Sequence, residues 1–175
     1  MRILFAASEA APFLKTGGLG DVASALPKAL SDSPDAEVFV FVPYYKAIKD
    51  NPNFEIEYVT HFFVPLSWRS VYAGLFRAKS NKDNLQYYFI DNEYYFYRDG
   101  AYGYYDDGER FAFFSKAVLE SLQYLNWYPN VIHANDWQTA LIPVFLRAFY
   151  MDLEAYQPIR TLFTIHNMEY QGKAP

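Results

Sequence analysis

Near its start the sequence reads Lys15-Thr16-Gly17-Gly18-Leu19-Gly20-Asp21-Val22, and this glycine loop guides the interpretation of the rest of the chain. An apolar strand candidate at 3–7 precedes it, and a helical pattern continues from it through Leu26 and Leu30. The first N–H groups of a helix lack intrahelical partners and carry the positive end of its dipole, so a strand, a glycine bend and a helix start can hold a phosphate. Glycines let the backbone approach an anion closely, and Lys15 adds a positive charge. Spacing alone leaves two interpretations open, a phosphate site and a plain loop at the entry to a helix.

The same glycines formally satisfy the G-x-G-x-x-A spacing of a dinucleotide-binding loop, with Gly18, Gly20 and Ala23. Two features disfavour that assignment. The first glycine of the fingerprint follows its strand directly, whereas residues 8–16 intervene here. The second strand should end in an acidic residue that binds the ribose, but the apolar run at 38–42 continues into proline and tyrosine. A nicotinamide cofactor is therefore a weak alternative.

Composition places the chain among globular domains. It has 175 residues, 52% hydrophobic and 20% charged, with a formal net charge of −5, which is enough for one domain with a sizeable core. This balance provides no basic surface for nucleic acid or an anionic membrane. The chain contains no cysteine, which fits a cytoplasmic location, and no apolar run approaches the roughly 20 residues needed to cross a membrane.

The order of strand and helix patterns predicts an α/β fold. The apolar run at 36–42 is typical of a strand buried on both faces, and with the glycine helix it makes a β-α-β unit. Residues 54–90 predict an antiparallel hairpin insertion and a strand that rejoins the sheet, with a turn at Asn81-Lys82-Asp83-Asn84. The remaining expected elements are a helix at 109–124, a strand at 130–134, a helix at 136–150 and a strand at 161–165. Together they predict a Rossmann-like, doubly wound, mostly parallel sheet.

A long segment at 91–107 links the hairpin region to the next helix and is rich in tyrosine, glycine and charge. Loops of this length are usually functional or disordered, and the aromatic content argues against disorder. Because the segment follows a strand, it reaches the same sheet edge as the glycine loop.

Polar side chains gather at the carboxyl ends of the predicted strands, where ligands bind in doubly wound sheets. Besides the glycine loop, the stretches at 133–138 and 166–167 fall on this edge. Each residue has a simpler alternative: Asp136 as a helix N-cap, His133 as a hydrogen-bonded core histidine, and His166 as part of a turn. The three histidines show no metal-ligand spacing, so no metal site is expected.

Four ordered motifs resemble those of bacterial glycogen synthases and plant starch synthases. They are residues 15–22, Tyr97-Arg98-Asp99 with 106–111, His133-Ala134-Asn135-Asp136-Trp137, and Thr164-Ile165-His166-Asn167 with Tyr170-Gln171-Gly172. The resemblance spans essentially the whole chain. It implies the GT-B fold, two Rossmann-like domains facing across a cleft, with residues 1–175 covering most of the N-terminal domain and the C-terminal nucleotide-binding domain lying outside this chain.

The resemblance also implies a reaction. Members of this family are retaining glucosyltransferases that move glucose from ADP-glucose to the non-reducing end of an α-1,4-glucan, without a metal or organic cofactor. The expected partners are ADP-glucose, a glycogen-like acceptor and the C-terminal domain. Residues 1–175 alone are expected to be inactive, because much of the nucleotide site belongs to that domain. A glucan-binding module is the alternative; it accounts for the tyrosines but not for Lys15 beside the glycines.

The resemblance assigns catalytic positions to His166 and Asp136, with His166 beside the anomeric carbon. The residues expected to bind substrate are Lys15, Gly17, Gly18, Asp21, Tyr102 and Asn167. This chain departs from the family pattern at Tyr102-Gly103, where many members have Tyr-His.

Overall fold

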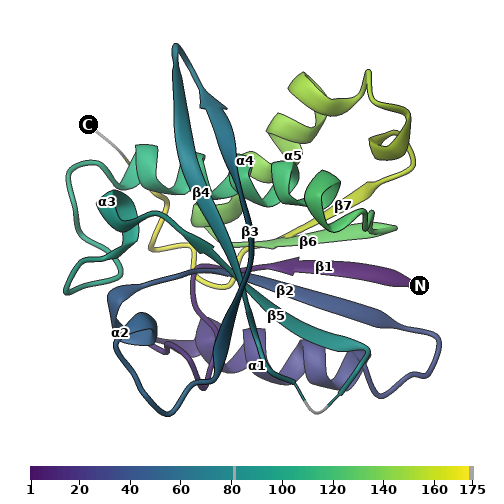
Figure 1. Ribbon diagram of the computed structural model, residues 1–175, viewed down its shortest axis with the longest axis horizontal. Coiled ribbons are helices and arrows are strands. Elements are labelled where there is room, and N and C mark those ends of the chain that lie inside the picture. Colours follow the sequence, from purple (N-terminus) through teal and green to yellow (C-terminus); the bar gives the residue numbers. More distant parts are fainter. Residues whose placement is uncertain (81, 174–175) are drawn as a thin grey trace.

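The computed structural model describes residues 1–80 and 82–173, which fold around a seven-stranded sheet (Figure 1). The strands lie in the order β3-β4-β5-β2-β1-β6-β7. Their bounds are β1 Arg2–Ala6, β2 Glu37–Pro43, β3 Ile56–Leu66, β4 Arg69–Ala78, β5 Leu85–Asp91, β6 Val131–Asn135 and β7 Arg160–Thr164. The α-helices are α1 Gly18–Leu30, α2 Lys46–Lys49, α3 Glu93–Phe96, α4 Asp107–Leu125 and α5 Leu141–Phe145.

The sheet is mostly parallel, as the sequence predicts. Strand β1 pairs in parallel with β2 and β6, β2 pairs with β5, and β6 pairs with β7. The antiparallel insertion is also confirmed, because β3 pairs with β4 and β4 with β5 in opposite directions. Strand β3 extends well beyond the alternating pattern at 54–59, and its tight turn into β4 contains Ser67 with φ of 56°. The predicted turn at 81–84 begins at Asn81, which lies outside the described residues.

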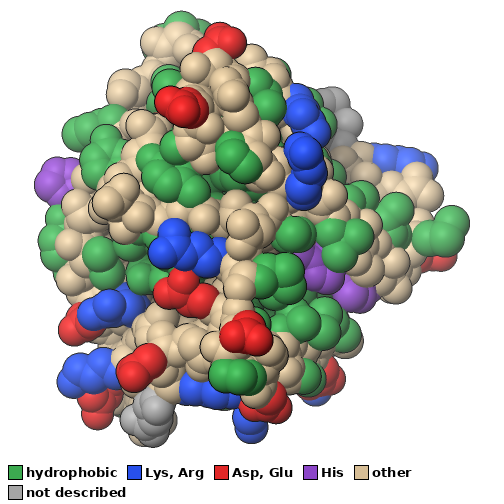
Figure 2. All heavy atoms as spheres, turned by 90° about the vertical axis from the view of Figure 1, so that its right-hand side faces the viewer, with side chains coloured by type: hydrophobic (Ala, Val, Ile, Leu, Met, Phe, Trp, Pro, Cys, Tyr) green, Lys and Arg blue, Asp and Glu red, His purple; other side chains and the backbone are tan. Residues whose placement is uncertain are grey.

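Helices cover both faces of the sheet, with α1 on one side and α4 and α5 on the other (Figure 1). The side chains of β2 from Val38 to Val42 are buried, as expected for a strand covered on both faces. Basic and acidic side chains are mixed on the face seen in Figure 2. None of the helices in residues 1–80 and 82–173 is both long and apolar enough to cross a membrane.

The prediction of a single helix at 136–150 is wrong. The segment forms a 3₁₀ turn at Trp137–Thr139, then α5, then a π-helical turn at Leu146–Tyr150. Pro143 lies inside this segment and has no N–H to donate, so regular i→i−4 bonding cannot run through it. The helical spacing of apolar residues indicates which side of this segment is buried, but it does not reveal where the helix is interrupted. A second 3₁₀ turn follows at Glu154–Tyr156.

The tyrosine-rich segment after β5 is ordered by charged side chains. Arg98 forms two hydrogen bonds to the carboxylate of Asp106, at 2.6 and 2.7 Å. Arg110 is fully buried and donates to the carbonyl oxygens of Tyr95 and Ala101. The sequence predicts a loop throughout this segment, but the segment begins with a short helix, α3. These contacts fix the loop against the end of the sheet.

Candidate functional site

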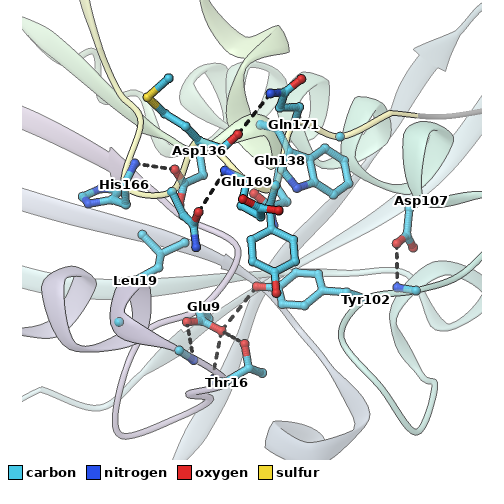
Figure 3. Close-up of a pocket in the computed structure, with 18 of the residues that line it drawn as sticks. Glu9, Thr16, Leu19, Tyr102, Asp107, Asp136, Gln138, His166, Glu169 and Gln171 are labelled. Carbon is cyan, nitrogen blue, oxygen red and sulfur yellow. Dashed lines mark hydrogen bonds between the residues drawn. The ribbon is translucent and has the colours of Figure 1, made fainter.

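A cavity of about 1100 Å³ lies at the carboxyl ends of β1 and β6 (Figure 3). The chain leaves β1 for α1 on one face of the sheet and reaches β6 from α4 on the other, so the cavity lies where the winding reverses. The predicted site residues that line it are Gly17, Gly18, Tyr102, Asp136, His166 and Asn167. The structure therefore brings together residues from four distant parts of the sequence.

Lys15 and Asp21 were predicted to contact substrate, but they do not belong to this lining among the described residues. The Lys15 ammonium instead pairs with the Asp21 carboxylate at 2.8 Å, and both side chains are more than half exposed. An exposed pair of this kind contributes little to stability. Lys15 therefore stands next to the lining residue Thr16 in the sequence, with its charge paired with Asp21.

The glycine loop is organised by Glu9, a residue that the sequence analysis did not single out. Glu9 is 2% exposed, and its carboxylate accepts hydrogen bonds from the N–H groups of Thr16, Gly17 and Gly20 at 3.0, 3.1 and 2.9 Å. An anion does sit at the start of α1, as the loop predicts, but it is supplied by the chain itself. One signal was available, since Glu9 is the only charged residue between Arg2 and Lys15 in the sequence.

Asp136 and His166 meet across the ends of β6 and β7. The Asp136 carboxylate accepts a hydrogen bond from the backbone N–H of His166 at 2.7 Å (Figure 3). It makes no side-chain capping bond to the following turn within the described residues, so the N-cap interpretation is wrong. Asp136 also has φ of 58°, a conformation uncommon outside glycine that is often found at functional sites.

The imidazole of His166 is oriented by Asn135. The side-chain amide of Asn135 is buried and donates to the carbonyl oxygens of Ala6 and His133, both at 3.1 Å. Its oxygen is therefore the acceptor that faces His166 Nε2 at 2.9 Å, and Nε2–H is the donor. In a neutral imidazole this leaves Nδ1 without a proton and able to accept one.

His133 is the buried, hydrogen-bonded histidine that the sequence suggested. It is 7% exposed, its Nε2 lies 2.8 Å from Thr164 Oγ1, and its ring packs edge-on against Phe5. Burial lowers the pKa of His133, because the charged imidazolium is poorly solvated there, and the nearby His166 acts in the same direction. It therefore links the ends of β6 and β7 and is not part of the cavity lining among the described residues.

Tyr102 joins the tyrosine-rich loop to the glycine loop. Its hydroxyl lies 2.7 Å from Ser8 Oγ and 3.4 Å from the Glu9 carboxylate, and burial raises the pKa of Tyr102. The next residue, Gly103, has φ of 91°, a conformation that favours glycine. The Gly103 N–H donates to Asp107 at 2.8 Å. The positive φ gives a physical reason for glycine at position 103, where many members of the family that the sequence resembles have histidine.

Asn167 and Gln138 complete the cavity wall. Asn167 Oδ1 accepts from the backbone N–H of Glu169 at 2.9 Å, so the segment after β7 does form a turn while also lining the cavity. Gln138 was not predicted; it is 8% exposed, and its Oε1 has no hydrogen-bond partner within the described residues. No cluster of three potential metal ligands occurs in the part of the chain that the structure describes.

Chemically, the cavity offers an anion-binding end and a polar end. The N–H groups of Gly18 and Leu19, in the first turn of α1, make no hydrogen bond to other described residues and both residues line the cavity. Asp136, His166 and Gln138 lie on the opposite side (Figure 3). Fold and site together define a doubly wound α/β domain with a largely polar cavity at its switch point.

Comparison with known proteins assigns the family. The starch synthase catalytic domain family matches residues 2–175. The chain is 52% identical over 178 residues to a glycogen synthase of Exiguobacterium sibiricum and 47% identical over 173 residues to one of Ligilactobacillus salivarius, covering 100% and 99% of this chain. The chain belongs to the starch synthase catalytic domain family. It spans 36% of the length of these two relatives.

A solved structure agrees with this assignment. The catalytic domain of starch synthase IV from Arabidopsis thaliana, bound to ADP and acarbose, superposes with a TM-score of 0.86 at 31% identity. The similarity covers 98% of this chain and 34% of that chain. The α/β architecture predicted from the sequence, and its relation to the GT-B starch synthase domain, are therefore confirmed.

Proposed function

We propose that the protein containing this chain transfers glucose from ADP-glucose to the non-reducing end of an α-1,4-glucan, with retention of the anomeric configuration. Family membership carries the proposal, together with the cavity that unites the glycine loop, Asp136 and His166. ADP and acarbose, a nucleotide and a sugar-like ligand, are bound by the similar starch synthase IV domain.

In this proposal the two ends of the cavity bind the two parts of the donor. The free N–H groups of Gly18 and Leu19 receive the diphosphate, where the helix dipole stabilises the charge that develops on the leaving group. Lys15 contributes a positive charge from the edge. Asp136 and His166 contact the transferred glucose, with Asn167 supporting His166 and Tyr102 closing the wall. The reaction proceeds without a metal or organic cofactor.

The proposal concerns the whole protein, because this chain spans about a third of the relatives' length. We propose that the remainder forms a second domain that holds the base and ribose and supplies further cations for the phosphates. Residues 1–175 alone would then bind a glucan weakly and transfer no glucose. The chain has no cysteine, which is compatible with the cytoplasmic location that we also propose.

Glucose incorporation into glycogen by the full-length protein tests this function, with ADP-glucose and UDP-glucose compared in parallel. Lys15→Ala should reduce incorporation by about tenfold to a hundredfold, the usual effect of losing a charged contact. Lys79→Ala is the matched control, since Lys79 is also an exposed, ion-paired lysine but lies at the end of β4 beside Glu55. Its activity should equal that of wild type.

Two results would contradict parts of the proposal. Wild-type protein that incorporates glucose from neither donor but still binds maltoheptaose would support the glucan-binding module instead. Full activity of Lys15→Ala would leave the proposed transferase function in place and show that Lys15 does not contribute to donor binding.

A further inference from the structure

The carboxylate of Glu9 satisfies some of the N–H groups with which the glycine loop predicts phosphate binding. Oε1 accepts from the N–H groups of Gly17 and Gly20, and Oε2 accepts from the N–H and hydroxyl of Thr16 (Figure 3). The Tyr102 hydroxyl adds a longer contact to Oε2 at 3.4 Å. Both oxygens therefore have their acceptor capacity filled by the protein.

A filled carboxylate cannot also bind a substrate hydroxyl, although Glu9 borders the cavity. Its effect on a ligand must be indirect. By accepting from Thr16, Gly17 and Gly20 it leaves the N–H groups of Gly18 and Leu19 as the ones available at the start of α1. Of the N–H groups in the glycine loop, those of Gly18 and Leu19 are thus the two that remain available to a ligand in the cavity.

Glu9 also connects two walls of the cavity. The glycine loop contacts its carboxylate from one side, and Tyr102, from the loop after β5, contacts it from the other. The same hydroxyl lies 2.7 Å from Ser8 Oγ, immediately after β1 and Ala7. Hydrogen bonds from backbone N–H to an ionised carboxylate are roughly twice as strong as neutral ones, so Glu9 holds the glycine loop more strongly than it holds Tyr102.

We propose that Glu9 is a positioning residue for the donor diphosphate: its buried carboxylate fixes the glycine loop so that the N–H groups of Gly18 and Leu19 bind the phosphates. The proposal rests on the proposed function, because it assumes a nucleotide-diphosphate sugar in the cavity. It also explains why a buried negative charge is tolerated beside an anionic ligand. The helix dipole and four donors already compensate that charge.

The test is Glu9→Gln in the full-length protein, with KM for ADP-glucose, KM for the glucan and kcat measured separately. Glutamine keeps the size of the side chain, but its NH₂ group faces two backbone or hydroxyl donors, so part of the loop loses its acceptor. KM for ADP-glucose and the Kd of ADP by calorimetry should rise about tenfold, with KM for the glucan unchanged. A purely structural role would lower the amount of active protein, and hence the apparent kcat, without changing either constant for the nucleotide.

Glu37→Gln is the matched control. Glu37 accepts a hydrogen bond from Trp127 Nε1 at 2.8 Å and pairs with Arg2, at the opposite end of the sheet from the cavity. It should leave KM for ADP-glucose unchanged. If Glu9→Gln does not fold, Thr16→Val removes one hydroxyl donor from the same carboxylate. That variant should raise KM for ADP-glucose about fivefold.

The outcomes separate this proposal from the proposed function. An unchanged or lowered KM and Kd in the Glu9 variant, with an active wild type, would overturn the positioning role alone. A wild type without transferase activity would overturn the proposed function. ADP calorimetry would still decide whether Glu9 positions the loop, since weaker ADP binding supports that role and equal binding refutes it.

Discussion

The glycine loop and the ends of β6 and β7 form opposite sides of one cavity, but they are held in different ways. In the glycine loop, the contacts to Glu9 join residues 7 to 11 positions apart in the sequence. On the other side, His166 bonds to Asn135 and Asp136, which are 31 and 30 positions away. One side is organised locally and the other by strand pairing.

This difference determines what each side can do. In the glycine loop, four donors are satisfied by the Glu9 carboxylate, so the chain itself holds the conformation of the loop. The side with Asp136 and His166 depends on the register of β6 against β7, where Asn135 pairs with Thr164. We therefore expect substitutions at the strand ends to have the largest effect on the rate of glucose transfer. Substitutions in the glycine loop should lower either the stability of the fold or the affinity for the sugar donor.

The largest effect is expected at Asp136. Asp136→Asn in the full-length protein keeps an acceptor for the His166 N–H and suits the positive φ, but removes the charge. We expect kcat/KM for glucose transfer to fall about tenfold to a hundredfold, because hydrogen bonds to charged groups are the stronger ones. Asp152→Asn, at an exposed position after the π-helical turn, is the control and should retain full activity. Equal activity of the two variants would show that the charge of Asp136 has no part in the reaction.

Two glycine variants distinguish a position in the glycine loop that is tightly packed from one that faces the cavity. A Cβ at Gly20 would lie 3.1 Å from Lys15 Cβ and 3.2 Å from its Cα, whereas a Cβ at Gly18 meets nothing within 4 Å. Gly20→Ala should therefore lower stability by about 1–3 kcal/mol, and Gly18→Ala should change it by less than about 1 kcal/mol.

Thermal unfolding of both variants checks this, with KM for ADP-glucose measured beside it. Gly18→Ala should still raise KM, because its methyl group enters the cavity wall. Similar melting temperatures for the two variants would contradict the packing difference.

The smallest effect concerns pH and His133, behind the strand ends. Because burial lowers the pKa of this imidazole in the folded chain, its contribution to stability is present above the ordinary value of 6.5 and is lost as pH falls through the folded value. His133→Asn should reduce the loss of Tm between about pH 7 and about pH 5 by a few degrees relative to wild type. His61→Asn, which changes an exposed histidine on β3, should leave that loss unchanged. An identical pH profile for all three proteins would contradict the buried-histidine assignment.

Much of the fold was predictable because the signals are local. The buried run of β2, the glycine helix and the β-α-β unit that joins β1 to β2 follow from apolar patterns within single elements. The split of 136–150 was missed because apolar residues kept their helical spacing on both sides of Pro143. The site was predicted as a set of strand ends, and the cavity does unite Gly18, Asp136 and His166.

The sequence by itself determined the order of most strands and of the two long helices, α1 and α4, and therefore which residues share the carboxyl edge of the sheet. Only the tertiary structure decided which groups face the ligand and which satisfy one another. Lys15 turns to Asp21, Glu9 takes the loop donors, and Tyr102 reaches Ser8 from 94 positions away. The physical reason is that side-chain partners depend on strand register and on competition among nearby donors and acceptors, and neither is encoded in the spacing of a motif.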